Sequence, residues 1–331
     1  MAKKVKQLLV CNSNMFIPTV MTETLGNPKE HYLVISDTKS ISKFFAFMAI
    51  PNVDYIEYGC TQGGFKFIEK KKELYEWVKK YDIDEVVFFH AEWGEMANWL
   101  IKKLSKAVPI KYCKIYDPIP APRSRNWKQV IRIKLQQWIW WGMDVDVLEL
   151  PQAFPSLPES FYKKIKAETI QIPVNCKLVS DYVSVKLDGL NLNVNYVLLT
   201  GTIVSDGLEE ANSYTELTNK VIEIVGKHNI VSKCHPRYND LYGMEQELPQ
   251  IPSFIPGNVL INNYKCFIGY ESTLLVEAAA AGKKSISMMS FLNISDETKQ
   301  RWVDFFDSRL QGRGKVLLPR TWDEFSVLIN S

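Results

Sequence analysis

The chain has 331 residues and a net charge of +3, so it is long enough for two domains with buried cores. Because positive and negative charges nearly balance, bulk attraction to nucleic acid is excluded and no nucleic-acid partner is predicted. We find no apolar run long enough to span a bilayer. The first residues also lack the apolar core and cleavage site of a signal peptide, so we expect a cytoplasmic protein.

The first half of the chain alternates strand-like and helix-like segments. Apolar runs predict buried strands at 7–12, 31–36, 53–58, 84–90 and 110–116. Helices are expected from Thr19 onward, over 67–80 and after residue 90. Strands that alternate with helices indicate a parallel, doubly wound sheet, which we place in a first α/β domain at 1–150.

Residues 123–141 combine basic and aromatic side chains without any acidic residue. The basic side chains are Arg123, Arg125, Lys128, Arg132 and Lys134, and the aromatic ones include Trp127, Trp138, Trp140 and Trp141. A helix over about 126–142 would bring both kinds side by side and could lie on an anionic membrane surface, at the inner face of a bacterial membrane. A helix that packs its tryptophans into the domain explains the same pattern, so both interpretations stay open.

A proline-rich stretch at 151–193 is expected to link this domain to a second α/β domain at 194–331. Strands are predicted at 194–199, 229–232, 259–261, 266–268 and 284–288. Helices fit 209–227, 273–281 and 298–310. The predicted fold class is therefore α/β, with two Rossmann-like domains that face a cleft.

Polar clusters follow three apolar runs of the second domain, at 201–207, 233–237 and 269–273. In an α/β domain this pattern places all of them at the carboxyl ends of parallel strands, where such sheets bind ligands. A glycine turn at Gly201 and Thr202 opens the first cluster. We expect the clusters to form one binding site.

His235 is the strongest candidate for phosphate or proton chemistry. Pro236 follows it and restricts its backbone to extended conformations, which suits a side chain held at a strand end. An imidazole can hydrogen-bond a phosphate or donate a proton near neutral pH, and the Arg237 guanidinium matches phosphate or carboxylate oxygens. A purely structural histidine is the alternative.

Ser272 and Thr273 are predicted to open a helix of small residues. A hydroxyl at a helix start caps free backbone N–H groups, and the same groups form an anion site. Capping alone explains both hydroxyls, whereas phosphate binding also explains why they share an edge with His235. Glu277, one turn into this helix, could reach a ribose, and a structural role for it stays open.

Two acids could serve as the general base. Asp206 follows the Gly201 turn, and Asp117 ends the fifth predicted strand of the first domain. An acid before glycine or proline is also ordinary turn chemistry. No DxD pair or metal-ligand spacing is present, so we expect neither a bound metal nor another cofactor.

These motifs resemble those of the bacterial lipooligosaccharide sialyltransferases, which have a GT-B-like fold, and the resemblance covers most of the chain. His235-Pro236-Arg237 looks like their HP motif, whose histidine acts at the donor phosphate. Tyr270-Glu-Ser-Thr273 looks like the serine motif that holds the phosphate of a CMP donor.

The resemblance also bears on the base. Residues 198–201 followed by Asp206 resemble the segment that supplies the base in the lipooligosaccharide group. Asp117 lies where related sialyltransferases carry two acids and a glycine, but Pro118 and Ile119 follow it here. This departure favours Asp206, and it leaves the sugar open between a sialic-acid-like nonulosonate and Kdo.

The resemblance implies an inverting, metal-independent transfer of such a sugar from a CMP donor to a bacterial surface glycan, as in lipooligosaccharide or capsule biosynthesis. The implied donor-site residues are Gly201, Thr202, Pro236, Arg237, Ser272, Thr273 and Glu277. A transferase for capsule or wall polymer with a CDP-glycerol or hexose donor is the alternative within enzymes. A non-catalytic nucleotide-binding scaffold of glycan assembly is the alternative outside them, and a homodimer stays open in each case.

Overall fold

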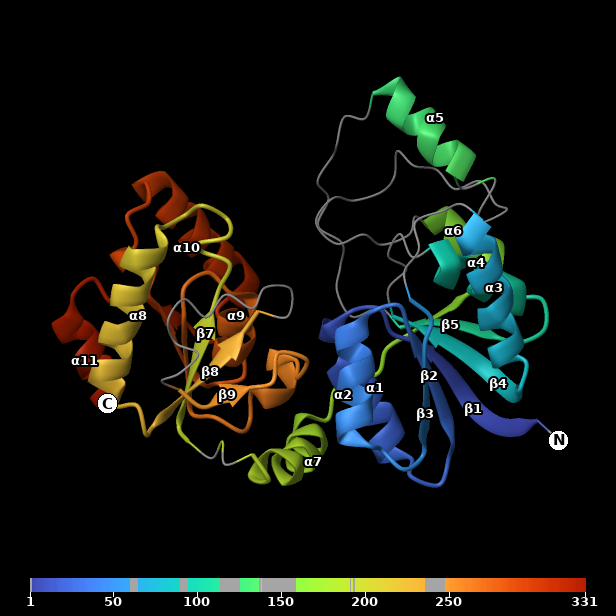
Figure 1. Ribbon diagram of the computed structural model, residues 1–331, viewed down its shortest axis with the longest axis horizontal. Coiled ribbons are helices and arrows are strands. Elements are labelled where there is room, and N and C mark those ends of the chain that lie inside the picture. The colour runs from blue at the N-terminus through green and yellow to red at the C-terminus, as the bar shows by residue number, and fades with distance from the viewer. Residues whose placement is uncertain are drawn as a thin grey trace. The chain divides into compact units, whose positions relative to one another are not determined.

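Two compact units make up the chain, Met1–Asn175 and Cys176–Ser331 (Figure 1). The computed structural model describes residues 2–59, 65–89, 95–113, 126–136, 138, 159–190, 192, 194–235 and 248–331. Each unit contains a six-stranded sheet, and every described strand pair is parallel. The predicted α/β class with two Rossmann-like units is therefore confirmed.

The sheet of the first unit has the strand order β3-β2-β1-β4-β5-β6. Its strands are β1 (Lys3–Val10), β2 (Tyr32–Ser36), β3 (Val53–Glu57), β4 (Tyr81–Phe88), β5 (Ile110–Cys113) and β6 (Glu168–Ile170). Its helices are η1 (Asn14–Phe16), α1 (Ile17–Gly26), α2 (Lys39–Met48), α3 (Phe65–Val78), α4 (Glu95–Leu104), α5 (Trp127–Gln136) and α6 (Glu159–Ile165). Every residue of β2 is buried, as expected for an apolar strand in a parallel sheet that helices cover on both faces.

The sheet of the second unit has the order β12-β11-β10-β7-β8-β9. Its strands are β7 (Tyr196–Thr200), β8 (Ile230–Cys234), β9 (Gln250–Ile251), β10 (Cys266–Gly269), β11 (Lys284–Ser287) and β12 (Val316–Leu317). Its helices are α7 (Cys176–Asp188), α8 (Ala211–Val225), η3 (Gly257–Leu260), α9 (Thr273–Ala280), η4 (Met289–Phe291), α10 (Asp296–Leu310) and α11 (Trp322–Asn330).

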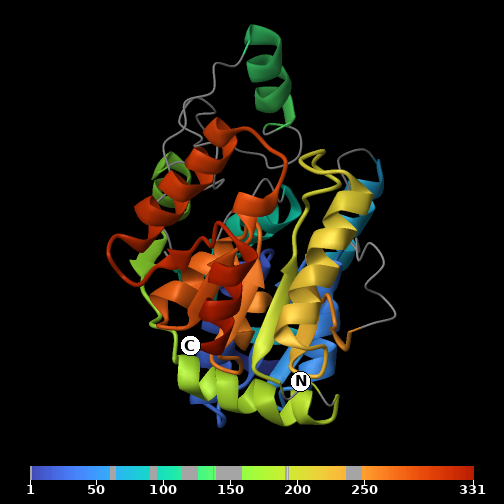
Figure 2. The ribbon, with the colours of Figure 1, turned by 90° about the vertical axis from the view of Figure 1, so that its left-hand side faces the viewer.

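Helices cover both faces of this second sheet (Figure 2). In the strand order of the sheet, β8 lies on one side of β7, whereas β11 lies on the opposite side of β10. The two connections therefore cross the sheet in opposite directions. Since crossovers between parallel strands are right-handed, α8 and α9 must lie on opposite faces. The α8 face has an apolar core in which Leu198 and Ile268 of the sheet meet Val221 of α8 and Phe325 of α11.

The stretch 151–193, expected to connect the domains, contributes elements to both units. It supplies α6 and β6 to the first unit and α7 to the second. β6 pairs with β5 at the edge of the first sheet.

The predicted strand at 259–261 is wrong, because the chain forms the 3₁₀ helix η3 there. Val259 and Leu260 are buried, and a short buried apolar run fits either conformation. Gly257, at the start of η3, packs so closely on Leu274 of α9 that a Cβ atom would overlap that side chain. This tertiary contact is not visible in the local sequence pattern.

Candidate functional site

Neighbouring strands of the second sheet end at the same level. Thr200 of β7 pairs with Cys234 of β8, so Gly201 and His235, the next residues, leave the sheet side by side. Adjacent strands lie about 4.8 Å apart. The register of β7 and β8 thus places the first two polar clusters next to each other, as predicted.

β10 lies on the other side of β7. Ile268 pairs with Leu198, and three residues further on Glu271 comes opposite Gly201. A Cβ atom on Gly201 would approach Oε1 of Glu271 to 2.9 Å, so the glycine makes room for this carboxyl group. β8, which follows β7 in the chain, lies on one side of β7, and β10, which comes later, lies on the other side. The strand order therefore reverses between β7 and β10. Open α/β sheets bind ligands at such a switch point.

A tight turn after β7 brings Asp206 back onto Thr202. The Asp206 amide donates to the Thr202 carbonyl oxygen at 2.7 Å, and Gly207 closes the turn with a φ of 68°, a conformation that glycine adopts without strain. Ile203 is fully buried beneath the turn. The Asp206 side chain itself is exposed to solvent.

Thr202, Asp206 and Glu271 form a hydrogen-bonded group that we call the carboxyl cluster. The Thr202 hydroxyl bonds Oδ2 of Asp206 and lies 3.4 Å from Oε1 of Glu271. Oε2 of Glu271 is buried and has no hydrogen-bond partner among the described residues. The cluster thus holds two carboxyl groups around one hydroxyl.

The pKa of Glu271 is raised to about 7, chiefly by burial and in part by the nearby charge of Asp206, while hydrogen bonds from the backbone and from Thr202 oppose this rise. A carboxyl group with such a pKa gains and loses a proton near neutral pH. Glu271 was not among the residues singled out from the sequence. Its position between the end of a strand and a helix cap is the signal that could have found it.

Buried neighbours fix the backbone from which Glu271 projects. The Tyr270 hydroxyl lies 3.2 Å from Oγ1 of Thr218, and the Ser287 hydroxyl donates to the Tyr270 carbonyl oxygen at 2.7 Å. The Tyr270 ring lies 5.1 Å from that of Tyr214, between centroids. Glu271 is therefore held by a rigid support and not by a loose loop.

Helix α9 begins two residues after Glu271, with Ser272 as its N-cap. The Ser272 hydroxyl accepts the Leu274 amide at 3.2 Å, and Thr273, the first helical residue, is exposed. The first turn carries no acidic side chain. The predicted N-cap is confirmed, and the free N–H groups of this turn can bind an anion.

Glu277 lies one turn into α9 and is partly buried. Burial raises its pKa to about 7. A carboxyl group near half-protonation can both donate and accept a hydrogen bond, as a pair of ribose hydroxyls would require.

A buried cation precedes His235. Lys233 is 5% exposed, and its Nζ donates to the carbonyl oxygens of Cys234 at 2.7 Å and Ser253 at 3.3 Å. Burial lowers its pKa to about 8. This buried charge lies two residues before the partly buried His235, close to the carboxyl end of β8, and favours an anion at that end of the strand.

All of the candidate residues that the structure describes belong to the second unit: Gly201, Thr202, Asp206, His235, Ser272, Thr273 and Glu277. Asp117, Pro236 and Arg237 lie outside the described residues, so their predicted roles stay predictions.

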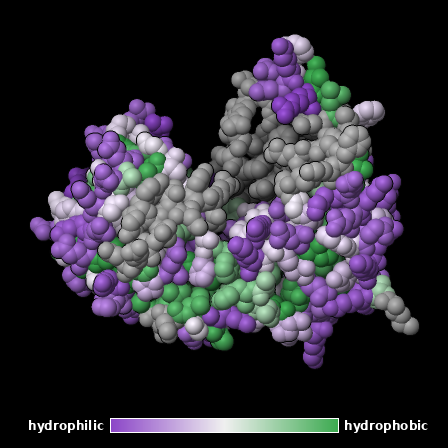
Figure 3. Space-filling model, viewed as in Figure 1, coloured by the Kyte–Doolittle hydropathy of each residue, from purple (hydrophilic) through white to green (hydrophobic). Residues whose placement is uncertain are grey.

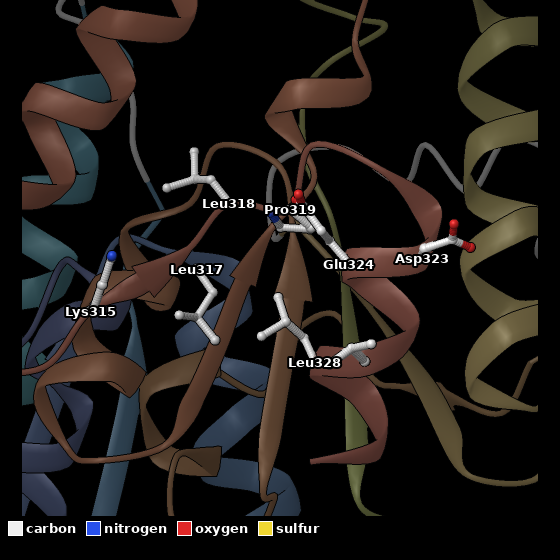
Figure 4. Close-up of a pocket in the computed structure, with 8 residues that line it drawn as sticks. Lys315, Leu317, Leu318, Pro319, Asp323, Glu324 and Leu328 are labelled. Carbon is white, nitrogen blue, oxygen red and sulfur yellow. The ribbon is translucent and has the colours of Figure 1, made fainter.

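A separate hollow lies at the far edge of the second sheet (Figure 4). Leu317 of β12 and Leu328 of α11 line it, together with Lys315 and Asp323. Two strands, β11 and β10, separate β12 from β7 in the sheet order. This hollow is therefore distinct from the carboxyl cluster.

Metal ligands do not gather within the described ranges: no three His, Cys, Asp or Glu side chains lie close enough to hold an ion. Nor is any helix in the described part of the chain long and apolar enough to cross a membrane.

Comparisons with known proteins identify the fold. No protein-family model and no curated protein sequence matches the chain. The UDP-GlcNAc 2-epimerase of Methanocaldococcus jannaschii matches 99% of this chain and 92% of its own, at 14% identity and a TM-score of 0.51. This likeness shows a GT-B-like fold of two Rossmann-like domains.

Two further structures resemble the chain less closely. The UDP-N-acetylglucosamine 2-epimerase of Rickettsia bellii has a TM-score of 0.41 and 17% identity, over 87% of this chain and 79% of that one. The wall teichoic acid polymerase TagF has a TM-score of 0.45 and 11% identity, over 98% and 88%.

Proposed function

We propose that the protein is a glycosyltransferase that moves a nonulosonate or Kdo residue from a CMP donor to a bacterial surface glycan. The observation that carries this proposal is the carboxyl cluster at the switch point, beside His235 and the start of α9. It combines proton acceptors with an anion site, and both are needed when a hydroxyl displaces a phosphate leaving group.

The choice of donor rests on the motifs and on the fold. The resemblance of His235-Pro236 and Ser272-Thr273 to sialyltransferase motifs favours CMP. The epimerase that shares the fold is named for a UDP-sugar, which supports a nucleotide-sugar substrate by fold-level analogy. The bacterial surface glycan and its link to lipooligosaccharide or capsule come from the same resemblance.

In the proposed reaction, Asp206 removes the proton from the acceptor hydroxyl. The oxygen then bonds to the anomeric carbon of the sugar while the bond from that carbon to the phosphate oxygen breaks. The electron pair of the broken bond stays on CMP, where His235 and the N–H groups at the start of α9 stabilise the charge. Attack from the face opposite the leaving group inverts the anomeric carbon.

Glu271 is proposed to act through Thr202. When protonated, it donates toward the Thr202 oxygen, which leaves the Thr202 hydrogen for Asp206. A protonated Glu271 also spares Asp206 the repulsion of a second negative charge. Glu271 is thus a positioning residue that keeps Asp206 oriented and ionised.

The remaining donor-site residues are assigned by position and by motif. Glu277 is proposed to bind the ribose. Arg237 is proposed to bind the phosphate through its guanidinium group, and Thr273 is proposed to bind the same phosphate through its backbone N–H. Gly201 and Pro236 shape the backbone around them. No metal takes part in this scheme.

Calorimetry with CMP, UMP and GDP tests the donor assignment. CMP is expected to bind at least about ten-fold more tightly than UMP or GDP, a difference of about 1.4 kcal/mol. Ser272→Ala should weaken CMP binding, while Ser326→Ala on α11 should leave it unchanged. Equal affinity for the three nucleotides, or none for CMP, would overturn the assignment.

A further inference from the structure

Helix α5 of the first unit carries an exposed apolar stripe. Trp127, Ile131 and Leu135 recur every four residues and are 68%, 49% and 52% exposed. Trp138, two residues past the end of the helix, is 74% exposed. Side chains four apart share a helix face, so the stripe is continuous. In Figure 3 this helix, at the top, shows hydrophobic atoms beside hydrophilic ones.

Such a stripe is unusual for a face in contact with water alone. Contiguous apolar surface with a polar rim marks a protein or membrane contact. Trp127 and Trp138 do not pack into the core of the unit, which argues against the core-packing interpretation for these two side chains, whereas Trp140 and Trp141 lie outside the described residues.

Basic side chains flank the stripe. Lys128, Arg132 and Lys134 are exposed, and Lys128 Nζ lies 5.7 Å from the centroid of the Trp127 ring. Helical spacing puts Lys128 and Arg132 on one side of the stripe and Lys134 on the other. Residues 118–143 contain no acidic side chain. The helix therefore presents a positive rim around an apolar centre.

The helix is stabilised by its own first turn. The backbone N–H of Gln129 donates to the side-chain Oδ1 of Asn126 at 2.9 Å, and the backbone N–H of Asn126 donates to the side-chain Oε1 of Gln129 at 3.1 Å. This reciprocal capping box satisfies two backbone donors without help from another element. α5 can thus keep its shape while its apolar face contacts something other than the protein core.

We propose that α5 docks on an anionic phospholipid bilayer, with its stripe among the headgroups and its cations on the lipid phosphates. Indole rings favour the membrane interface, and lysine and arginine stems let their charged ends reach the phosphates. A second copy of the chain would bring a second positive rim against the first, so self-pairing through α5 is electrostatically disfavoured. The proposal requires neither donor nor acceptor, so it can fail or succeed independently of the proposed enzymatic function.

Sedimentation with vesicles tests the proposal on the full chain. Wild-type protein should bind vesicles that contain phosphatidylglycerol, bind pure phosphatidylcholine weakly, and be released as salt screens the charges. The variant with Lys128→Gln, Arg132→Gln and Lys134→Gln should bind roughly 10²-fold less tightly, about five-fold for each cation near an anionic surface. Replacing Lys29, Lys227 and Lys265 with Gln removes the same charge from exposed sites elsewhere and should have little effect.

A second pair of variants tests the apolar stripe. Trp127→Ala with Trp138→Ala should weaken binding at least about ten-fold, because alanine lacks the apolar area of an indole. Val185→Ala with Val327→Ala removes exposed apolar side chains from α7 and α11 and serves as the control. Lipids brominated in the acyl chain should quench the tryptophan fluorescence of wild type more than that of the α5 variant.

The proposal is overturned if correctly folded wild-type protein, checked by circular dichroism, never sediments with phosphatidylglycerol vesicles. It is equally overturned if both control variants lose as much binding as the α5 variants. Ultracentrifugation showing a dimer that Trp127→Ala dissociates would assign the stripe to a second copy instead. Unchanged vesicle binding in the α5 variants, together with binding of an acidic protein that they lose, would assign it to that protein.

Discussion

Asp206 and Glu271 come from the ends of different strands and meet at one hydroxyl group, that of Thr202. Thr202 bonds the carboxylate of Asp206 and lies 3.4 Å from Oε1 of Glu271. The two acids lie beside the switch point between β7 and β10, where open α/β sheets bind ligands.

Asp206→Asn should lower kcat by ~10²–10⁴-fold, because the amide keeps the shape of the side chain but cannot take a proton. Affinity for CMP should stay within a few-fold of wild type. His235→Ala should instead lower kcat and CMP affinity together, because His235 is proposed to stabilise the phosphate of the leaving group. Steady-state kinetics and calorimetry check both. If Asp117→Asn abolishes transfer while Asp206→Asn keeps nearly normal activity, the general base belongs to the first unit.

Glu271→Gln should change the pH dependence of the reaction. The pKa of Glu271 is raised to about 7, so wild-type activity should fall as the pH rises through that value and the acid loses its proton. Glutamine mimics the protonated form and should keep activity to higher pH. The test is a pH profile of kcat for both proteins, with the exposed Glu216→Gln as a control. Superimposable wild-type and Glu271→Gln profiles would show that the group has no such role.

Glu277→Gln should alter how stability depends on pH. The folded pKa of Glu277, about 7, lies above the unfolded value of about 4.3, so folding favours the protonated form. The contribution of the protonated Glu277 to the free energy of unfolding is complete below the pKa of the unfolded state. It is lost as the pH rises through the pKa of the folded state. Urea unfolding should give nearly equal stabilities for variant and wild type at pH 4, and at pH 8 a variant more stable by roughly 3–4 kcal/mol. A constant difference at all pH values would refute this linkage.

The sequence predicts the fold better than the site. Apolar runs mark most strands, since strands buried on both faces must be apolar, and the glycine turn and serine cap mark their ends. Glu271 was missed because its role depends on β10 pairing beside β7, and strand order is not encoded in local pattern. The strand predicted at 259–261 failed for a related reason, because the close approach of Gly257 to Leu274 is a tertiary contact.

Activity should not depend on a divalent metal. The proposed chemistry uses Asp206 as the base and protein N–H groups at the phosphate, so EDTA should reduce the rate by less than two-fold, roughly. Addition of Mg²⁺ or Mn²⁺ after chelation should then have little effect. A rate that collapses in EDTA and returns with either ion would contradict the metal-free scheme.

Release of CMP from a CMP-sugar tests the central claim most directly. Purified protein would be incubated separately with CMP-N-acetylneuraminic acid, CMP-Kdo, CDP-glycerol and UDP-N-acetylglucosamine, and the freed nucleotide quantified by chromatography. We predict that at least one CMP-sugar is turned over, that the other two donors are not, and that His235→Ala lowers the rate. Turnover of CDP-glycerol or the UDP-sugar alone would assign another transferase activity, and no turnover of any donor would contradict an enzymatic role.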